Sequence, residues 1–158
     1  TASLPLDMLW EPLHGFGVTA SASFNDSSIK VSAPEASSSV GNDPIPLPGL
    51  SDRVYNFTAY YERGGFEARV SQRKRSDFVG EIGNFAGERT LRYVVGEDIT
   101  DGQISYKFSD ESVPGLSLLM QVSNLNNSSY RTYAGSKDRP LENIKWGRTV
   151  LFGVNYRF

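Results

Sequence analysis

Residues 149–158, TVLFGVNYRF, show the cleanest alternation of apolar and polar residues in this chain. Every second residue from Val150 to Phe158 is aliphatic or aromatic, and the residues between them are mostly polar or glycine. A period of two is that of a β-strand whose side chains point alternately to two unlike faces, whereas an amphipathic helix repeats every 3.6 residues. The C-terminal stretch is therefore predicted to be a strand with one apolar face.

The same alternation recurs upstream and predicts an all-β, antiparallel fold. It is found in five further runs, residues 16–24, 55–62, 66–71, 103–108 and 116–123, and residues 2–10 are expected to be the tail of a seventh strand. Each strand approaches the roughly 9–11 residues that a tilted membrane-spanning strand needs. No apolar stretch approaches the roughly 18 residues of a transmembrane helix.

The connections between the predicted strands alternate in length. Residues 27–53, 76–98 and 126–146 form long connections, whereas Arg63-Gly64-Gly65 and residues 109–115 are short turns. Short turns on one side and long loops on the other are typical of outer-membrane barrels. On this reading the apolar positions nearest the short turns are mostly aromatic, as expected of an interfacial belt: Phe16, Tyr61, Phe66, Phe108, Leu116 and Phe158. An antiparallel sandwich with one face on a core and one in water is the alternative.

The composition excludes several classes of function. The 158 residues carry 16 basic and 18 acidic side chains, so no electrostatic case exists for binding nucleic acid. The chain has no cysteine and a single histidine, His14, which excludes thiolate chemistry and a multi-histidine metal site. His14 lies in a turn and is not expected to be catalytic. We therefore expect no enzyme activity, no cofactor and no metal site, and the residues from Asn124 to Asn127 are expected to form a turn.

Six or seven strands cannot close a transmembrane barrel, because bacterial single-chain barrels have at least eight. An open sheet in lipid would leave two rows of unpaired backbone groups, each group costing several kcal/mol. Residues 1–158 are therefore expected to be the C-terminal portion of a larger antiparallel transmembrane β-barrel.

Several passages together resemble the C-terminal barrel of TonB-dependent outer-membrane receptors. They are LPGLS (47–51), YNFTAYYE (55–62), GFEARVS (65–71), RSDF (75–78), SNLNN (123–127) with Tyr130-Arg131, and GRTVLFGVNYRF (147–158). The resemblance implies a barrel of about 22 strands, with a plug domain and a TonB box that are expected outside these residues.

The family also implies partners and a location. The partners are the remaining strands and plug, TonB–ExbB–ExbD, the barrel-assembly machinery, the lipid and lipopolysaccharide of the bacterial outer membrane, and a scarce small-molecule nutrient. LPGLS and RSDF are most similar to receptors for carbohydrate uptake, which favours an oligosaccharide. A siderophore or metal chelate is the alternative nutrient, and a soluble carbohydrate-binding β-sandwich is the alternative from a different class.

Three sets of candidate functional residues follow. The long loops carry aromatic and arginine side chains suited to a sugar or an anionic chelate: Phe78, Phe85, Arg89, Arg92, Tyr93, Tyr130, Arg131 and Tyr133. Trp146, just before the last strand, is expected in an interfacial belt. Polar side chains expected to face the lumen and the plug are Glu67, Arg69, Arg73, Lys107, Gln121, Asn155 and Arg157. The resemblance implies an assembly signal in Val154, Tyr156 and Phe158.

Overall fold

The computed structural model describes residues 1–30, 43–85, 88–109 and 111–157, with the backbone alone for residues 84, 85, 88 and 89. Within these residues the chain is all-β. It forms two antiparallel sheets and two single-turn 3₁₀ helices, η1 (Leu6–Met8) and η2 (Glu11–Leu13). The predicted fold class is thus confirmed at the level of an all-β, antiparallel chain.

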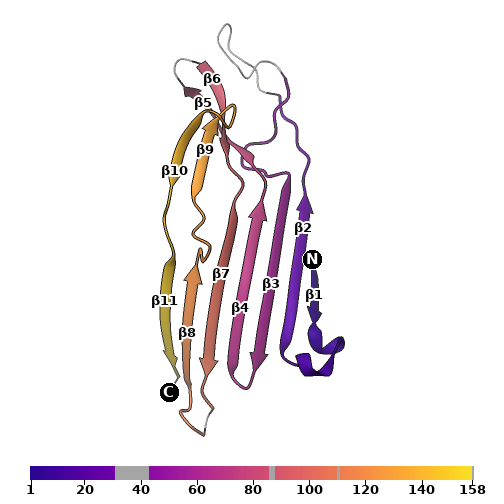
Figure 1. Cartoon of the computed structure of the whole chain (residues 1–158), viewed down its shortest axis with the longest axis vertical. Coiled ribbons are helices and arrows are strands. Elements are labelled where there is room, and N and C mark those ends of the chain that lie inside the picture. Colours follow the sequence, from indigo (N-terminus) through magenta and orange to yellow (C-terminus); the bar gives the residue numbers. More distant parts are fainter. Residues whose placement is uncertain (31–42, 86–87, 110, 158) are drawn as a thin grey trace.

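A seven-stranded sheet makes up most of the structure, with the order β1-β2-β3-β4-β7-β8-β11 (Figure 1). Its strands are β1 (Ala2–Pro5), β2 (Phe16–Phe24), β3 (Arg53–Arg63), β4 (Phe66–Arg75), β7 (Asp98–Lys107), β8 (Leu116–Ser123) and β11 (Thr149–Tyr156). All six predicted strands and the seventh are present. The first strand is shorter than expected, because the chain turns into η1 directly after Pro5 and into η2 around Pro12, and proline cannot donate to a strand ladder.

Two of the three long connections, residues 76–98 and 126–146, are not simple loops, which corrects the sequence interpretation. They contain β5 (Phe78–Phe85), β6 (Glu88–Val94), β9 (Tyr130–Ala134) and β10 (Pro140–Ile144), which pair in the order β10-β9-β6-β5. We call these four strands the hairpin sheet. Irregular register between Val79 and Glu81, and between Pro140 and Glu142, interrupts the period of two that would have revealed the strands.

The register of the seven-stranded sheet sorts its side chains onto two unlike faces. The apolar face includes two rows that cross the sheet: Val18, Ala59, Val70, Gly102, Val122, Val150, and Phe16, Tyr61, Ala68, Ile104, Met120, Phe152. The opposite set forms the polar face, with a row made of Tyr60, Arg69, Gln103, Gln121 and Leu151. The alternation in the sequence therefore becomes a separation of two continuous surfaces.

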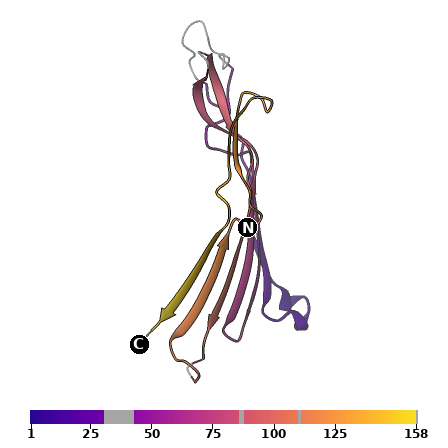
Figure 2. The same cartoon turned by 60° about the vertical axis from the view of Figure 1, so that its left-hand side comes forward.

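The buried side chains lie away from the large apolar face. Among the described residues the buried apolar ones are Ile45, Val79, Val94, Tyr133 and Ala134, and four of these five belong to the hairpin sheet. Figures 1 and 2 show this sheet beyond the ends of the long strands and not across their face. On the apolar face Phe152 is 76% exposed and Ile104 49% exposed. Within the described residues no second layer of protein covers this face.

The turn between β3 and β4 follows the sequence prediction. Gly64 and Gly65 both have positive φ, 58° and 83°, as in the tight two-residue turns that glycine favours. A Cβ atom at position 65 would also lie only 2.3 Å from the carbonyl oxygen of Lys107, so a side chain would collide with it. This turn brings Phe66 next to Tyr61, and the Tyr61 ring in turn lies 4.4 Å from that of Phe16. Phe16, Tyr61 and Phe66 thus form a contiguous row of rings at the short-turn end.

Candidate functional site

The polar face of the long strands carries the residues predicted to face a lumen. The register aligns Arg69 with Gln103 and Gln121, and Lys107 with Ser117, which also pairs with Asn155. Glu67 accepts a hydrogen bond from the Ser105 hydroxyl at 3.1 Å. The remaining two of the set are Arg73 on β4 and Arg157 directly after β11. The pairing of the strands places these polar residues on one face of the sheet. That they contact a plug stays a prediction.

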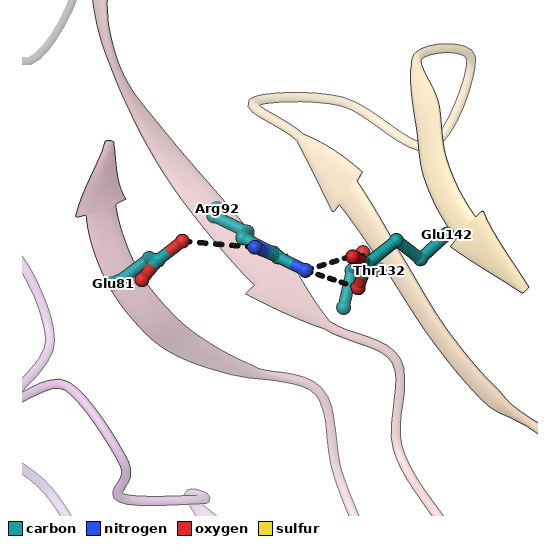
Figure 3. Close-up of polar contacts among 4 residues, drawn as sticks. All are labelled: Glu81, Arg92, Thr132 and Glu142. Carbon is teal, nitrogen blue, oxygen red and sulfur yellow. Dashed lines mark hydrogen bonds and ion pairs between the residues drawn. The ribbon is translucent and has the colours of Figure 1, made fainter. Parts of the chain in front are cut away.

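A charged cluster ties the two hairpins of the hairpin sheet together (Figure 3). The Arg92 guanidinium on β6 lies 2.9 Å from the Glu81 carboxylate on β5 and also pairs with Glu142 on β10. Thr132 on β9 donates a hydrogen bond to Glu142. The hydrogen bond with Glu81 contributes most to raising the pKa of Arg92, which stays cationic. Arg92 therefore cross-links four strands, and its donors are largely engaged within the protein.

A second polar cluster centres on Asp77, between β4 and β5. Its carboxylate accepts hydrogen bonds from the Gly96 N–H at 2.7 Å and the Tyr133 hydroxyl at 3.2 Å, and pairs with Lys137 at 3.0 Å. Burial raises the pKa of Asp77, but these hydrogen bonds and the charge of Lys137 outweigh it and hold the pKa below its ordinary value. The carboxylate thus fixes one end of β9 against the start of β5.

Tyr133 should ionise late in an alkaline titration. Burial, together with the neighbouring Asp77 carboxylate, raises its pKa to about 12 from 10.0. The raised pKa means that the neutral phenol stabilises the folded hairpins fully below about pH 10, and that this contribution is lost as the pH rises through 12. Tyr133→Phe should remove the latest tyrosinate absorbance step, whereas Tyr60→Phe on the polar face should retain it. A late step that survives Tyr133→Phe would contradict the assignment.

The other predicted loop residues occupy different environments. The Phe78 ring lies 4.1 Å beneath the Arg75 guanidinium, and Tyr93 stacks in parallel on Tyr133 with centroids 5.1 Å apart. Arg131 is exposed, and Tyr130 lies against Trp146 with centroids 5.6 Å apart.

Three predicted residues cannot be placed in this way. The side chains of Phe85 and Arg89 lie outside the part of the chain that the structure describes, as does Phe158 of the expected assembly signal. The role of the whole loop set in ligand binding stays a prediction.

A pocket of about 320 Å³ opens where the polar face meets the base of the hairpin sheet, and we call it the junction pocket. Among the residues that line it are Arg73, Asp101, Ser123, Tyr130, Trp146 and Thr149. Arg73, Asp101, Ser123 and Thr149 all belong to the polar face, as the pairing of their strands requires. Trp146 therefore lies on the polar side of the sheet, whereas the sequence suggested an interfacial belt.

Asn124 is a positioning residue that the sequence analysis treated only as part of a turn. It takes a left-handed backbone conformation with φ 58°. Its side-chain amide donates to the carbonyl oxygens of Ser128 at 3.0 Å and Gly147 at 2.8 Å, and its side-chain oxygen accepts the Ser128 N–H. The expected turn is thus confirmed. Asn124 also joins the start of the β8–β9 connection to Gly147, the residue after Trp146. The local sequence does not predict this long-range contact.

Three further observations concern membrane-spanning helices, metal ions and known proteins. No described helix is long and apolar enough to cross a membrane. The described residues contain no group of three or more histidine, cysteine, aspartate or glutamate side chains that could hold a metal ion. No protein-family model, curated protein or solved structure proved similar to this chain.

Proposed function

We propose that this chain is the C-terminal barrel segment of a TonB-dependent transporter of the bacterial outer membrane, and that the transporter imports an oligosaccharide with energy delivered through TonB. In this proposal the strands of the seven-stranded sheet belong to a transmembrane barrel of about 22 strands. The hairpin sheet stands on the extracellular side, and the polar face lines the lumen. The motifs at residues 47–78 and 123–158 carry the resemblance to this family.

The observation that carries the proposal is the broad, exposed apolar face opposite a polar one. On β11 this face runs from Val150 to Tyr156, and on β8 from Leu116 to Val122. The six steps of about 3.3 Å each cover about 20 Å along a strand, or about 15 Å across a bilayer at a tilt of about 40°, which is a large part of the roughly 25 Å apolar band of outer-membrane barrels. Lipid contact accounts for exposed apolar side chains on this scale, which water-soluble monomers rarely present as one patch.

The edges of the sheet support the same conclusion. β1 and β11 are its edge strands, and each is paired on one side within the sheet. In a bilayer the outer backbone groups of both strands would need partners, because unpaired groups cost several kcal/mol each in hydrocarbon. Further strands of a closed barrel would supply them, as the proposal requires.

Labelling at single cysteines tests whether lipid touches the apolar face. Residues 1–158 contain no cysteine, so each introduced thiol is unique once any cysteine outside these residues is replaced by serine. One pair is Ile104→Cys with Gln103→Cys on β7, and a second is Phe152→Cys with Leu151→Cys on β11. Each variant of the full-length protein receives an environment-sensitive fluorophore and is reconstituted into phosphatidylcholine vesicles with quenchers on the acyl chains. We expect strong quenching at 104 and 152 and little at 103 and 151.

The two alternatives give different results in this experiment. A soluble β-sandwich would remain in the aqueous phase, and no position would be quenched by the lipid chains. Equal quenching at adjacent positions would also overturn the proposed orientation of the faces. A siderophore receptor of the same fold would give the expected alternation, so the nature of the nutrient needs the separate test below.

A further inference from the structure

We infer that the junction pocket is a binding subsite for one ring of a neutral oligosaccharide, with Tyr130 and Trp146 as its stacking wall. The inference rests on the proposed function, since it places the nutrient on the polar face at the base of the hairpin sheet. It adds the position of the subsite, the residues that form it and the charge of the ligand.

The aromatic wall is preformed and open to solvent. The rings of Tyr130 and Trp146 have centroids 5.6 Å apart and planes inclined by 37°. Trp146 is 71% exposed, although the neighbouring Tyr130 ring supplies an apolar surface against part of it. The apolar C–H faces of a sugar ring fit flat aromatic surfaces of this kind, while the polar ends of tyrosine and tryptophan remain available for hydrogen bonds.

Polar groups beside the wall have unused hydrogen-bonding capacity. Among the described residues the side chains of Arg73, Ser123 and Thr149 make no hydrogen bond or ion pair. One oxygen of the Asp101 carboxylate accepts the Asn124 N–H at 2.9 Å, which leaves its second oxygen to accept from a ligand. Donors, hydroxyls and a carboxylate next to an aromatic surface match the hydroxyl-rich edge and apolar faces of a sugar.

The charge of the pocket argues against an anionic chelate. Its lining contains one guanidinium, from Arg73, and two carboxylates, from Glu97 and Asp101. Glu97 is already paired with the Arg75 Nε at 2.9 Å. An anionic ligand would meet the Asp101 carboxylate with only Arg73 to offset it, whereas a neutral polyol can use both groups. The charge of the pocket therefore favours a neutral sugar over an anionic siderophore.

Hydrogen bonds within the protein hold the two segments that form the aromatic wall. The Asn124 amide bonds both to Ser128, two residues before Tyr130, and to Gly147, the residue after Trp146. These bonds hold the segments that carry the two rings together. Side chains fixed before binding lose less conformational entropy when the ligand arrives.

Calorimetric titration of the full-length protein in mild detergent tests the inference. The probes are three neutral oligosaccharides, maltohexaose, cellohexaose and xylohexaose, and one anionic chelate, ferric citrate. We expect binding of at least one neutral probe and none of ferric citrate. Trp146→Ala and Tyr130→Ala should each weaken that binding about ten-fold, corresponding to about 1.4 kcal/mol, whereas Trp146→Phe should recover most of the affinity.

The matched control is Trp10→Ala, which removes a similarly exposed tryptophan, 64% exposed, between η1 and η2. It should leave the affinity unchanged. Absence of binding by all three neutral probes, binding of ferric citrate, or equal affinities for Trp146→Ala and the parent protein would overturn the inference. Because the titration uses no bilayer, its failure is distinct from a failure of the lipid-quenching pattern, which would overturn the membrane proposal instead.

Discussion

Met120→Arg should nearly abolish insertion of the protein into a bilayer, whereas Leu119→Arg on the same strand should allow it. The two residues are adjacent on β8 and equally exposed within this chain, 38% and 37%. Met120 belongs to the apolar face and Leu119 to the polar face. If lipid contacts the apolar face, only the guanidinium at position 120 must enter hydrocarbon.

The expected difference is large. An arginine near the bilayer midplane on the lipid side of a barrel costs about 2–4 kcal/mol. At 1.4 kcal/mol for each ten-fold change, the equilibrium for insertion should shift by about 30- to 1,000-fold. The fraction of protein that resists extraction from vesicles by urea, measured across urea concentrations, gives this shift directly.

Leu119→Arg is an internal control for loss of side-chain packing and for the added charge. An isolated sheet in water would respond alike to both substitutions, because water reaches both positions to the same extent. Equal behaviour of the two variants would therefore contradict lipid contact at Met120. A stronger defect for Leu119→Arg would reverse the assignment of the two faces.

Val79→Asp should unfold the hairpin sheet while the long strands stay paired. Val79 is fully buried, and its carbonyl oxygen accepts a hydrogen bond from the Gly49 N–H at 2.7 Å. A carboxylate at this position would be buried without a partner, which destabilises a fold by about 4 kcal/mol or more. Hydrogen exchange should report faster exchange, by about 1,000-fold, for amides of β6 and β9, and little change in β3 and β4.

Val113→Asp is the matched control, since Val113 is 38% exposed in the turn between β7 and β8. Substitutions at exposed sites usually change stability by no more than about 0.5 kcal/mol. Unchanged protection of β6 in the Val79→Asp variant would show that the hairpin sheet is not held by this core. Loss of protection in every strand would show instead that the two sheets unfold together.

The long strands and their faces were predictable because the information is local. In β11 each apolar residue is two positions from the next, and backbone geometry alone sends such residues to the same side. Gly64 and Gly65 similarly predict a tight turn, because residues other than glycine rarely adopt two successive positive φ values. Trp146 shows the limit of this reasoning, since its position before a strand did not reveal that its ring lies beside Tyr130.

The pattern of residues predicts an antiparallel β chain with one apolar and one polar face, because a period of two depends only on the backbone. Long-range pairing joins β5 and β6 to β9 and β10 in one sheet, since β6 pairs with β9 across some forty residues. It also brought Asp101, Asn124 and Trp146 to one pocket, because their proximity depends on register between strands distant in sequence. The register between distant strands cannot be read from a local pattern. In the hairpin sheet irregular pairing also breaks the alternation of apolar and polar residues.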